Sequence, residues 1–161
     1  MRILYIHGLD SSPNPDRMGY LEERGHQLWG LHLDYMNEPE SYHQLRTLAK
    51  QQEVEFLVGS SLGGFLGFWL GEELGLPCLL FNPAMYVSLE EANIHLEESV
   101  HSPERWVVLG ANDETVDPQR NWAFFEQKLD TTLFQRVSLV QGLGHQIDLD
   151  TFSSYARWAG L

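Results

Sequence analysis

Residues 55–70, EFLVGSSLGGFLGFWL, place an apolar strand pattern, a serine-bearing turn and a Leu- and Phe-rich helix pattern in immediate succession. The pentapeptide at 59–63, GSSLG, fits G-x-S-x-G with Ser61 at its centre. A turn this sharp needs glycine at Gly59 and Gly63, because side chains two positions before and after the serine would clash. We therefore predict that Ser61 is held above the end of a strand as a candidate nucleophile.

Other interpretations of this turn are a structural Gly-rich connection or an anion-binding loop at a helix N-terminus. A phosphate-binding loop would require Gly-Lys-Ser/Thr, yet no lysine lies between Lys50 and Lys128. The neighbouring Ser60 does not fit the motif, because Val58 and Leu62 stand two positions away on either side. The nucleophile remains the preferred interpretation, and it requires a base.

Strand and helix patterns alternate along the whole chain, which predicts an α/β fold with about six mostly parallel strands and helices on both faces. In such sheets ligands bind beyond the carboxyl ends of the strands. The expected strands are 2–7, 26–33, 55–58, 77–81, 105–110 and 134–140; the expected helices are 40–52, 62–75, 118–129 and 149–159, with a loop at 8–19 and a helical turn at 20–25.

The base and the acid should follow the nucleophile in the order Ser, Asp/Glu, His. His145 stands in a Gly-rich loop after the last strand, where no other histidine follows a late strand. Asp113 lies just beyond the strand at 105–110 and is the favoured acid. Asp117 is the second choice, and it ranks lower because its side chain can instead cap the next helix. Asp148 is a weaker rival that is better placed to cap the last helix.

An acyl-transfer site also needs two backbone donors for an oxyanion. The turn aims the Leu62 N–H in that direction, and the loop after the first strand supplies a second donor, Leu9 N–H. Gly8 allows this loop to approach a substrate closely. His7 would break the chain order as a base, so we interpret it as a residue that shapes the loop.

Composition limits the remaining classes of function. The chain has 161 residues, is 43% hydrophobic and carries a net charge of −13, which fits a single domain over 1–161 and disfavours binding to nucleic acid or anionic membranes. Cys78 is the only cysteine, so neither an intrachain disulfide nor a cysteine zinc site can form. With no apolar run of membrane-spanning length and no signal-peptide pattern in MRILYIHG, we expect a cytoplasmic protein without membrane insertion.

The motifs IHGLDSSP, GSSLGG, FNPA, NDETVD and GLGH together resemble those of the bacterial YqiA/UPF0227-type family of small α/β-hydrolase-fold esterases. The resemblance covers nearly the whole chain, although Leu9 stands where the family commonly has an aromatic residue. It implies a minimal α/β-hydrolase fold with a short lid-like segment at 83–105 and no large cap domain. It also implies a triad of Ser61, Asp113 and His145.

We therefore expect a serine hydrolase that cleaves small carboxylic esters or thioesters of the acyl-CoA kind through an acyl-enzyme, with no metal or organic cofactor. Binding of CoA esters would be helped by a cation such as Arg17 or Arg24 at the entrance, because the chain is acidic overall. A catalytically silent binding protein of the same fold and a serine peptidase or amidase are the alternatives. No pattern indicates an oligomeric state, and the apolar stripe from Leu89 to Val100 fits either a lid or a dimer contact.

Overall fold

The computed structural model describes residues 1–96, 101, 103–129 and 135–161. Strands and helices alternate along the described chain, as the sequence patterns predict. Their bounds are β1 Arg2–Ile6, α1 Pro15–Glu23, β2 Gln27–Trp29, α2 Ser41–Gln51, β3 Phe56–Ser60, α3 Leu62–Leu74, β4 Cys78–Phe81, β5 Arg105–Gly110, α4 Pro118–Leu129, β6 Gln135–Val140 and α5 Leu149–Trp158.

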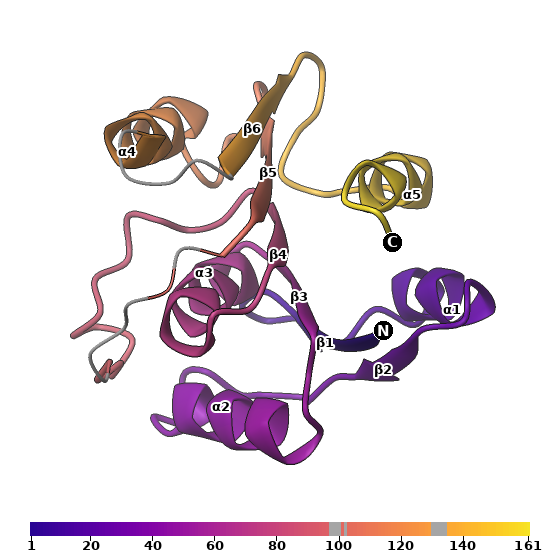
Figure 1. The fold of residues 1–161 in the computed structure, drawn as a ribbon. Helices are drawn as coiled ribbons and strands as arrows, with labels where there is room; N and C mark the ends of the chain where they lie inside the picture. The colour runs from indigo at the N-terminus through magenta and orange to yellow at the C-terminus, as the bar shows by residue number, and fades with distance from the viewer. Residues whose placement is uncertain (97–100, 102, 130–134) are drawn as a thin grey trace.

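The strands form one sheet in the order β2-β1-β3-β4-β5-β6, and every neighbouring pair is parallel. Helices α2, α3 and α4 cover one face of this sheet, while α1 and α5 cover the other (Figure 1). Because all strands run the same way, the loops that follow β1, β3, β4, β5 and β6 meet at one edge. This arrangement confirms the predicted fold class.

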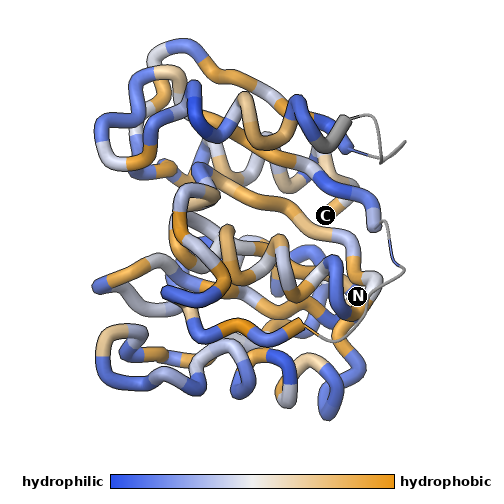
Figure 2. Tube along the Cα trace, turned by 90° about the vertical axis from the view of Figure 1, so that its left-hand side faces the viewer, coloured by the Kyte–Doolittle hydropathy of each residue, from blue (hydrophilic) through white to orange (hydrophobic). Residues whose placement is uncertain are grey.

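Each face of the sheet has its own apolar core, and alternation along the strands divides the side chains between them. In β1, Leu4 and Ile6 belong to the core beneath α2, α3 and α4, whereas Ile3 and Tyr5 belong to the core beneath α1 and α5. Figure 2 shows hydrophobic colour along the central strands and hydrophilic colour on much of the surrounding trace. The sequence reads as continuous apolar runs because both faces are buried.

The single cysteine is part of this core. Cys78 begins β4 and is fully buried, with an exposed fraction of 0%. Burial raises the pKa of its thiol well above the usual range, because the thiolate would lack solvation.

Two predicted boundaries are wrong at the N-terminal end of the fold. The expected loop at 8–19 ends early, because Asn14 caps a helix that begins with Pro15. Its side chain accepts a hydrogen bond from Arg17 N at 3.0 Å. The expected strand at 26–33 is reduced to three residues of β2.

The segment after β4 also differs from its helix-like pattern. Ser88 and Glu91, three residues apart, form a capping box: Ser88 N donates to Glu91 Oε2 at 2.8 Å, and Glu91 N donates to Ser88 Oγ at 3.1 Å. Turns follow instead of a continuous helix, and Asn93 has a φ of 50°. Leu89 and Ala92 pack against the core of the same chain, while Val100 lies outside the described residues.

Among the described helices, none is both long enough and apolar enough to cross a lipid bilayer.

Candidate active site

The turn between β3 and α3 holds Ser61 in a conformation that side-chain-bearing residues rarely adopt. Ser61 has φ 56° and ψ −123°, and its amide N–H donates to Phe81 O at 2.9 Å. A Cβ on Gly59 would lie 2.4 Å from Gly63 O. A Cβ on Gly63 would lie 2.3 Å from the carbonyl oxygens of Ile6 and His7, at the end of β1 and just after it. The two glycines are therefore required for the turn, for the steric reason that the motif predicts.

The loop after β1 passes directly beside this serine. A Cβ on Gly8 would lie 3.2 Å from Ser61 Cβ and 3.8 Å from Ser61 Oγ. The next residue, Leu9, and the first residue of α3, Leu62, both line the cavity that contains Ser61. Among the described residues, neither backbone N–H has a hydrogen-bond partner. Two unpartnered backbone donors therefore flank the serine.

His145 and Asp113 form a hydrogen-bonded pair, with 2.7 Å between His145 Nδ1 and Asp113 Oδ2. The other carboxylate oxygen of Asp113 accepts from Thr115 N at 2.8 Å and Val116 N at 2.9 Å. Asp113 is buried, so its orientation is fixed on both sides. With Nδ1 engaged, His145 has Nε2 left to serve a reacting group, and its ring lines the same cavity as Ser61.

The two rival carboxylates have structural roles instead. Asp117 accepts from Gln119 N at 2.8 Å at the start of α4, and Asp148 accepts from Thr151 N at 2.7 Å at the start of α5. Both are N-cap interactions of the kind expected for these positions. Neither side chain is hydrogen-bonded to His145 among the described residues.

Asn82, just after β4, braces the loop that carries His145, a contact that sequence reasoning did not find. Its Nδ2 donates to Gly144 O at 3.0 Å and His145 O at 3.1 Å, and its Oδ1 accepts from Gly110 N at 2.7 Å. Asn82 is buried and has a φ of 42°, a conformation that asparagine tolerates better than most residues. The sequence signal at this position is the Asn-Pro pair after a strand, but the partners of Asn82 lie 28, 62 and 63 residues further along the chain.

His7 is buried behind the site and acts on the loop, as the sequence indicates. Its Nε2 accepts from Leu33 N at 2.9 Å, which leaves Nδ1 as the protonated nitrogen, 2.7 Å from Gly8 O. Tyr35 Oη donates to His7 O at 2.7 Å. Burial lowers the pKa of His7, because the charged imidazolium would lose solvation.

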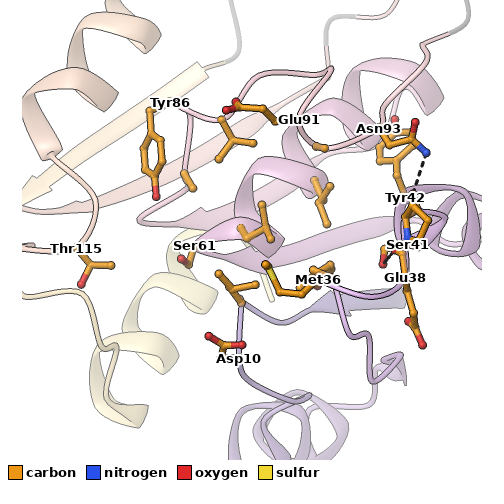
Figure 3. Close-up of a pocket in the computed structure, with 18 of the residues that line it drawn as sticks. Asp10, Met36, Glu38, Ser41, Tyr42, Ser61, Tyr86, Glu91, Asn93 and Thr115 are labelled. Carbon is orange, nitrogen blue, oxygen red and sulfur yellow. Dashed lines mark hydrogen bonds between the residues drawn. The ribbon is translucent and has the colours of Figure 1, made fainter.

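A cavity of about 760 Å³ opens beside Ser61. Figure 3 shows Ser61 toward one end and Tyr42 and Asn93 toward the other. The far end is held by a hydrogen bond from Asn93 Nδ2 to Pro39 O at 3.0 Å, which joins the segment after β4 to the loop before α2. The described part of the lid-like segment therefore forms one wall of the cavity.

The cavity wall is largely apolar with acidic groups at intervals. Its exposed apolar residues are Leu9, Met36 and Tyr86. The charged side chains that line it are all acidic: Asp10, Glu38 and Glu91. Within the described part of the chain, no group of three or more His, Cys, Asp or Glu side chains is placed to hold a metal ion.

The sequence profile of the family described as "Uncharacterised protein family (UPF0227)" matches residues 2–105. The chain belongs to this family. The match includes the turn with Ser61 and the Asn82 region, and it ends at the start of β5, before Asp113 and His145. No curated protein sequence matches this UPF0227 member.

Solved structures similar to this UPF0227 chain include α/β-hydrolases. SOBER1 of Arabidopsis thaliana has a TM-score of 0.72 at 16% identity, covering 99% of this chain and 97% of its own. A monoacylglycerol lipase of Paleococcus ferrophilus has a TM-score of 0.77 at 12% identity, covering 98% and 93%. MGS-MChE2, an alpha/beta hydrolase from the metagenome of Mar Chica lagoon sediments, has a TM-score of 0.70 at 14% identity, covering 99% and 89%.

At these identities the likeness establishes the fold. The UPF0227 chain has the α/β-hydrolase fold, and its described residues contain no large cap domain.

Proposed function

We propose that this protein is a serine hydrolase that cleaves small carboxylic esters or thioesters. The observation that carries the proposal is the placement of Ser61, on its strained turn, in the same cavity as His145, whose Nδ1 is bound to buried Asp113 at 2.7 Å. A serine hydroxyl is a weak nucleophile unless a base removes its proton, and an oriented imidazole is the group that does so. Esterase and lipase names among the structural neighbours agree with this class of reaction.

In the proposed mechanism, His145 Nε2 takes the proton of Ser61 Oγ as that oxygen bonds to the substrate carbonyl carbon. The carbonyl π electrons move onto the oxygen, which accepts hydrogen bonds from the N–H groups of Leu9 and Leu62. Collapse breaks the bond to the alcohol or thiol, and the imidazolium protonates that leaving group. Water, deprotonated by His145, then releases the acid and restores Ser61.

Asp113 acts through His145 in this scheme. Its Oδ2 fixes the imidazole with Nδ1 protonated and stabilises the imidazolium that forms in each half-reaction. Its Oδ1 stays bound to Thr115 N and Val116 N, so the carboxylate does not need to rotate. The pair is therefore organised before a substrate binds.

The size and lining of the cavity favour a compact substrate. A volume of about 760 Å³ lies within the range of small-molecule sites and accommodates an apolar acyl chain along Met36, Leu62 and Leu66. The acidic side chains on the wall disfavour an anionic acyl group there. Short-chain esters and thioesters with a neutral acyl group are the proposed substrates.

The decisive experiment is labelling with a fluorophosphonate probe, followed by intact mass and peptide mapping. We expect one adduct, on Ser61, lost in Ser61→Ala and strongly reduced in His145→Ala, together with hydrolysis of short-chain nitrophenyl esters by the wild type. Circular dichroism of each variant controls for folding. A folded wild type that forms no adduct and cleaves no ester would refute the proposal and favour a non-catalytic binding protein of this fold. Profiling with amide substrates separates an esterase from an amidase.

A further inference from the structure

A second, smaller hollow of about 120 Å³ lies beside Ser61. It shares Leu9, Ser61, His145 and Gln146 with the large cavity, so the two spaces meet at the serine. Most of the remaining wall comes from β1, the loop after it and the start of α1, with Ser60 of β3 and Ile147 of the loop after β6 added, and it is mostly polar. A substrate bound at Ser61 can therefore extend in two chemically different directions.

Among the residues that the structure describes, Arg17 is the only lysine or arginine on the wall of either space. Its Nη1 donates to Tyr5 Oη at 3.1 Å, its Nη2 donates to Ile147 O, and its guanidinium carbon lies 5.7 Å from the centre of the Phe152 ring. Among the described residues it forms no ion pair with a carboxylate. An oriented guanidinium thus lines the same hollow as Ser61, with no carboxylate partner among the described residues and three of its five N–H donors outside the two hydrogen bonds given above.

The two spaces differ in charge. The large cavity has Asp10, Glu38 and Glu91 on its wall, whereas the described residues that line the hollow include Arg17 and no acidic side chain. The net charge of the chain is −13, so the hollow that Ser61 shares with Arg17 carries local charge opposite in sign to that of the protein as a whole. An anionic group on a substrate would be repelled from the large cavity and attracted to the hollow.

We propose that the hollow binds a carboxylate on the alcohol part of the substrate, with Arg17 as its partner; this inference rests on the proposed function. The leaving oxygen must lie next to His145, which protonates it, and three consecutive residues of the His145 loop, 145–147, line the hollow. The acyl part then occupies the large, more apolar cavity. Guanidinium binds carboxylate through charge-assisted hydrogen bonds, which are about twice as strong as neutral ones.

The volume of the hollow limits what it holds. At about 120 Å³, the hollow is well below the roughly 300–1,000 Å³ of sites that hold a drug-sized ligand. A carboxylate with one or two carbons fits this space, while a nucleotide does not. The substrate class is therefore an ester of a small hydroxy acid, and the nucleotide part of an acyl-CoA would have to remain outside the hollow.

Arg24 provides a matched control. It lies in a different surface hollow with Glu23, His26 and Arg157, stacked 5.3 Å from the centre of the Tyr20 ring. It lines neither space at Ser61. Removing its charge changes the net charge of the protein as much as removing that of Arg17.

The test compares two butyrate esters of similar size that differ in the charge on the alcohol part: butyryl glycolate and its neutral methyl ester. Release of butyrate is the readout for both, because the methyl ester carries a second ester bond. We expect the wild type to have a higher kcat/KM for the carboxylate. Arg17→Gln should lower the ratio of the two kcat/KM values by about tenfold or more, chiefly through KM, and Arg17→Lys should restore part of it. Arg24→Gln should leave both esters unchanged, and the preference should weaken with salt.

The possible failures are distinguishable. An equal loss for both esters in Arg17→Gln would overturn the inference and leave Arg17 as a residue that only holds the His145 loop through Ile147 O. A wild-type preference for the methyl ester, or hydrolysis of neither ester while Ser61 is still labelled by fluorophosphonate, would also overturn it. Absence of both labelling and hydrolysis would instead refute the proposed function.

Discussion

The two oxygens of Asp113 have different partners, and this separates its role from that of a helix cap. Oδ2 contacts the His145 imidazole, while Oδ1 holds two backbone N–H groups. The side chain of Asp117, four positions later, accepts a hydrogen bond from the backbone N–H of Gln119 at the start of α4. The two carboxylates therefore make a matched pair for mutation.

For Asp113→Asn we expect kcat for ester hydrolysis to fall on the order of a thousandfold or more, because an amide cannot hold the imidazole with Nδ1 protonated or stabilise the imidazolium. For Asp117→Asn we expect kcat to stay within about twofold and stability within a few tenths of a kcal/mol, because asparagine is an equally good cap. Steady-state kinetics and urea unfolding of both variants check this. Similar kinetic losses in the two would contradict the assigned roles.

Buried His7 predicts a pH dependence of stability. Its pKa is lowered by burial from the ordinary 6.5, so as pH falls through 6.5 the unfolded chain binds a proton that the folded chain does not. The free energy of unfolding should therefore fall between pH 7.5 and 5.5, by at most about 1.4 kcal/mol per pH unit from this group. His7→Gln should reduce that slope.

Urea unfolding at the two pH values measures this effect. His26 also has a pKa lowered by burial, so His26→Gln is the control that removes its separate contribution. An unchanged slope in His7→Gln would show that His7 is already protonated in the folded state or contributes nothing to the pH dependence.

The sequence predicted the positions of Ser61, Asp113 and His145 because each follows a strand in a recognisable order. It did not predict the hydrogen bonds from Asn82 to the loop that carries His145, or the hydrogen bond from Arg17 to Ile147 O, because each joins segments that are far apart in sequence. Asn82 reaches His145 only after β5, α4 and β6 have been placed. Such contacts follow from the assembled topology and leave no periodic pattern.

At the level of elements, the packing of β1, β3 and α3 depends on how closely their backbones approach. The Cβ of an alanine at position 63 would lie 2.3 Å from Ile6 O and His7 O, and backbone atoms cannot move aside. Gly19 in α1 has open space and ordinary helical geometry.

We therefore expect Gly63→Ala to destabilise the fold by about 2 kcal/mol or more and Gly19→Ala to stabilise it by roughly 0.5–1 kcal/mol. Urea unfolding or, for a variant that fails to fold, the yield of soluble protein measures the difference. If Gly63→Ala left the free energy of unfolding unchanged, the turn between β3 and α3 would be less tightly packed than the structure indicates.

Element boundaries were predictable where the periodic pattern had clear ends, and not elsewhere. The strand at 105–110 and the helix at 118–129 match the structure at both ends. The expected strand at 26–33 stops at Trp29, because Gly30 turns against Pro13 and the chain continues to Leu33, which donates to His7. Buried polar groups are usually hydrogen-bonded, and the bond from Leu33 N to buried His7 stabilises a non-strand path for residues 30–33 although their sequence favours a strand.

At the scale of the whole molecule, net charge should govern how substrates arrive. Acyl-CoA thioesters carry phosphates, so a protein of net charge −13 repels them before any contact is made. We expect kcat/KM for a short acyl-CoA to rise severalfold between about 0.01 M and 0.1 M salt, as the screening length falls from roughly 30 to 10 Å. A neutral ester of the same acyl group is the control and should change little. A flat response for the acyl-CoA would show that local groups, not the overall charge, control its approach.

The position of Cys78 makes unfolding directly observable in this protein. Cys78 is fully buried on β4, which lies between β3 and β5, so a thiol reagent can reach its sulfur only when the centre of the sheet opens. The rate of modification under native conditions then measures the free energy of that opening without denaturant. Because the chain has no second cysteine, each molecule that has opened gains the mass of one reagent group. The fraction of modified protein over time therefore gives the rate at which the centre of the sheet opens.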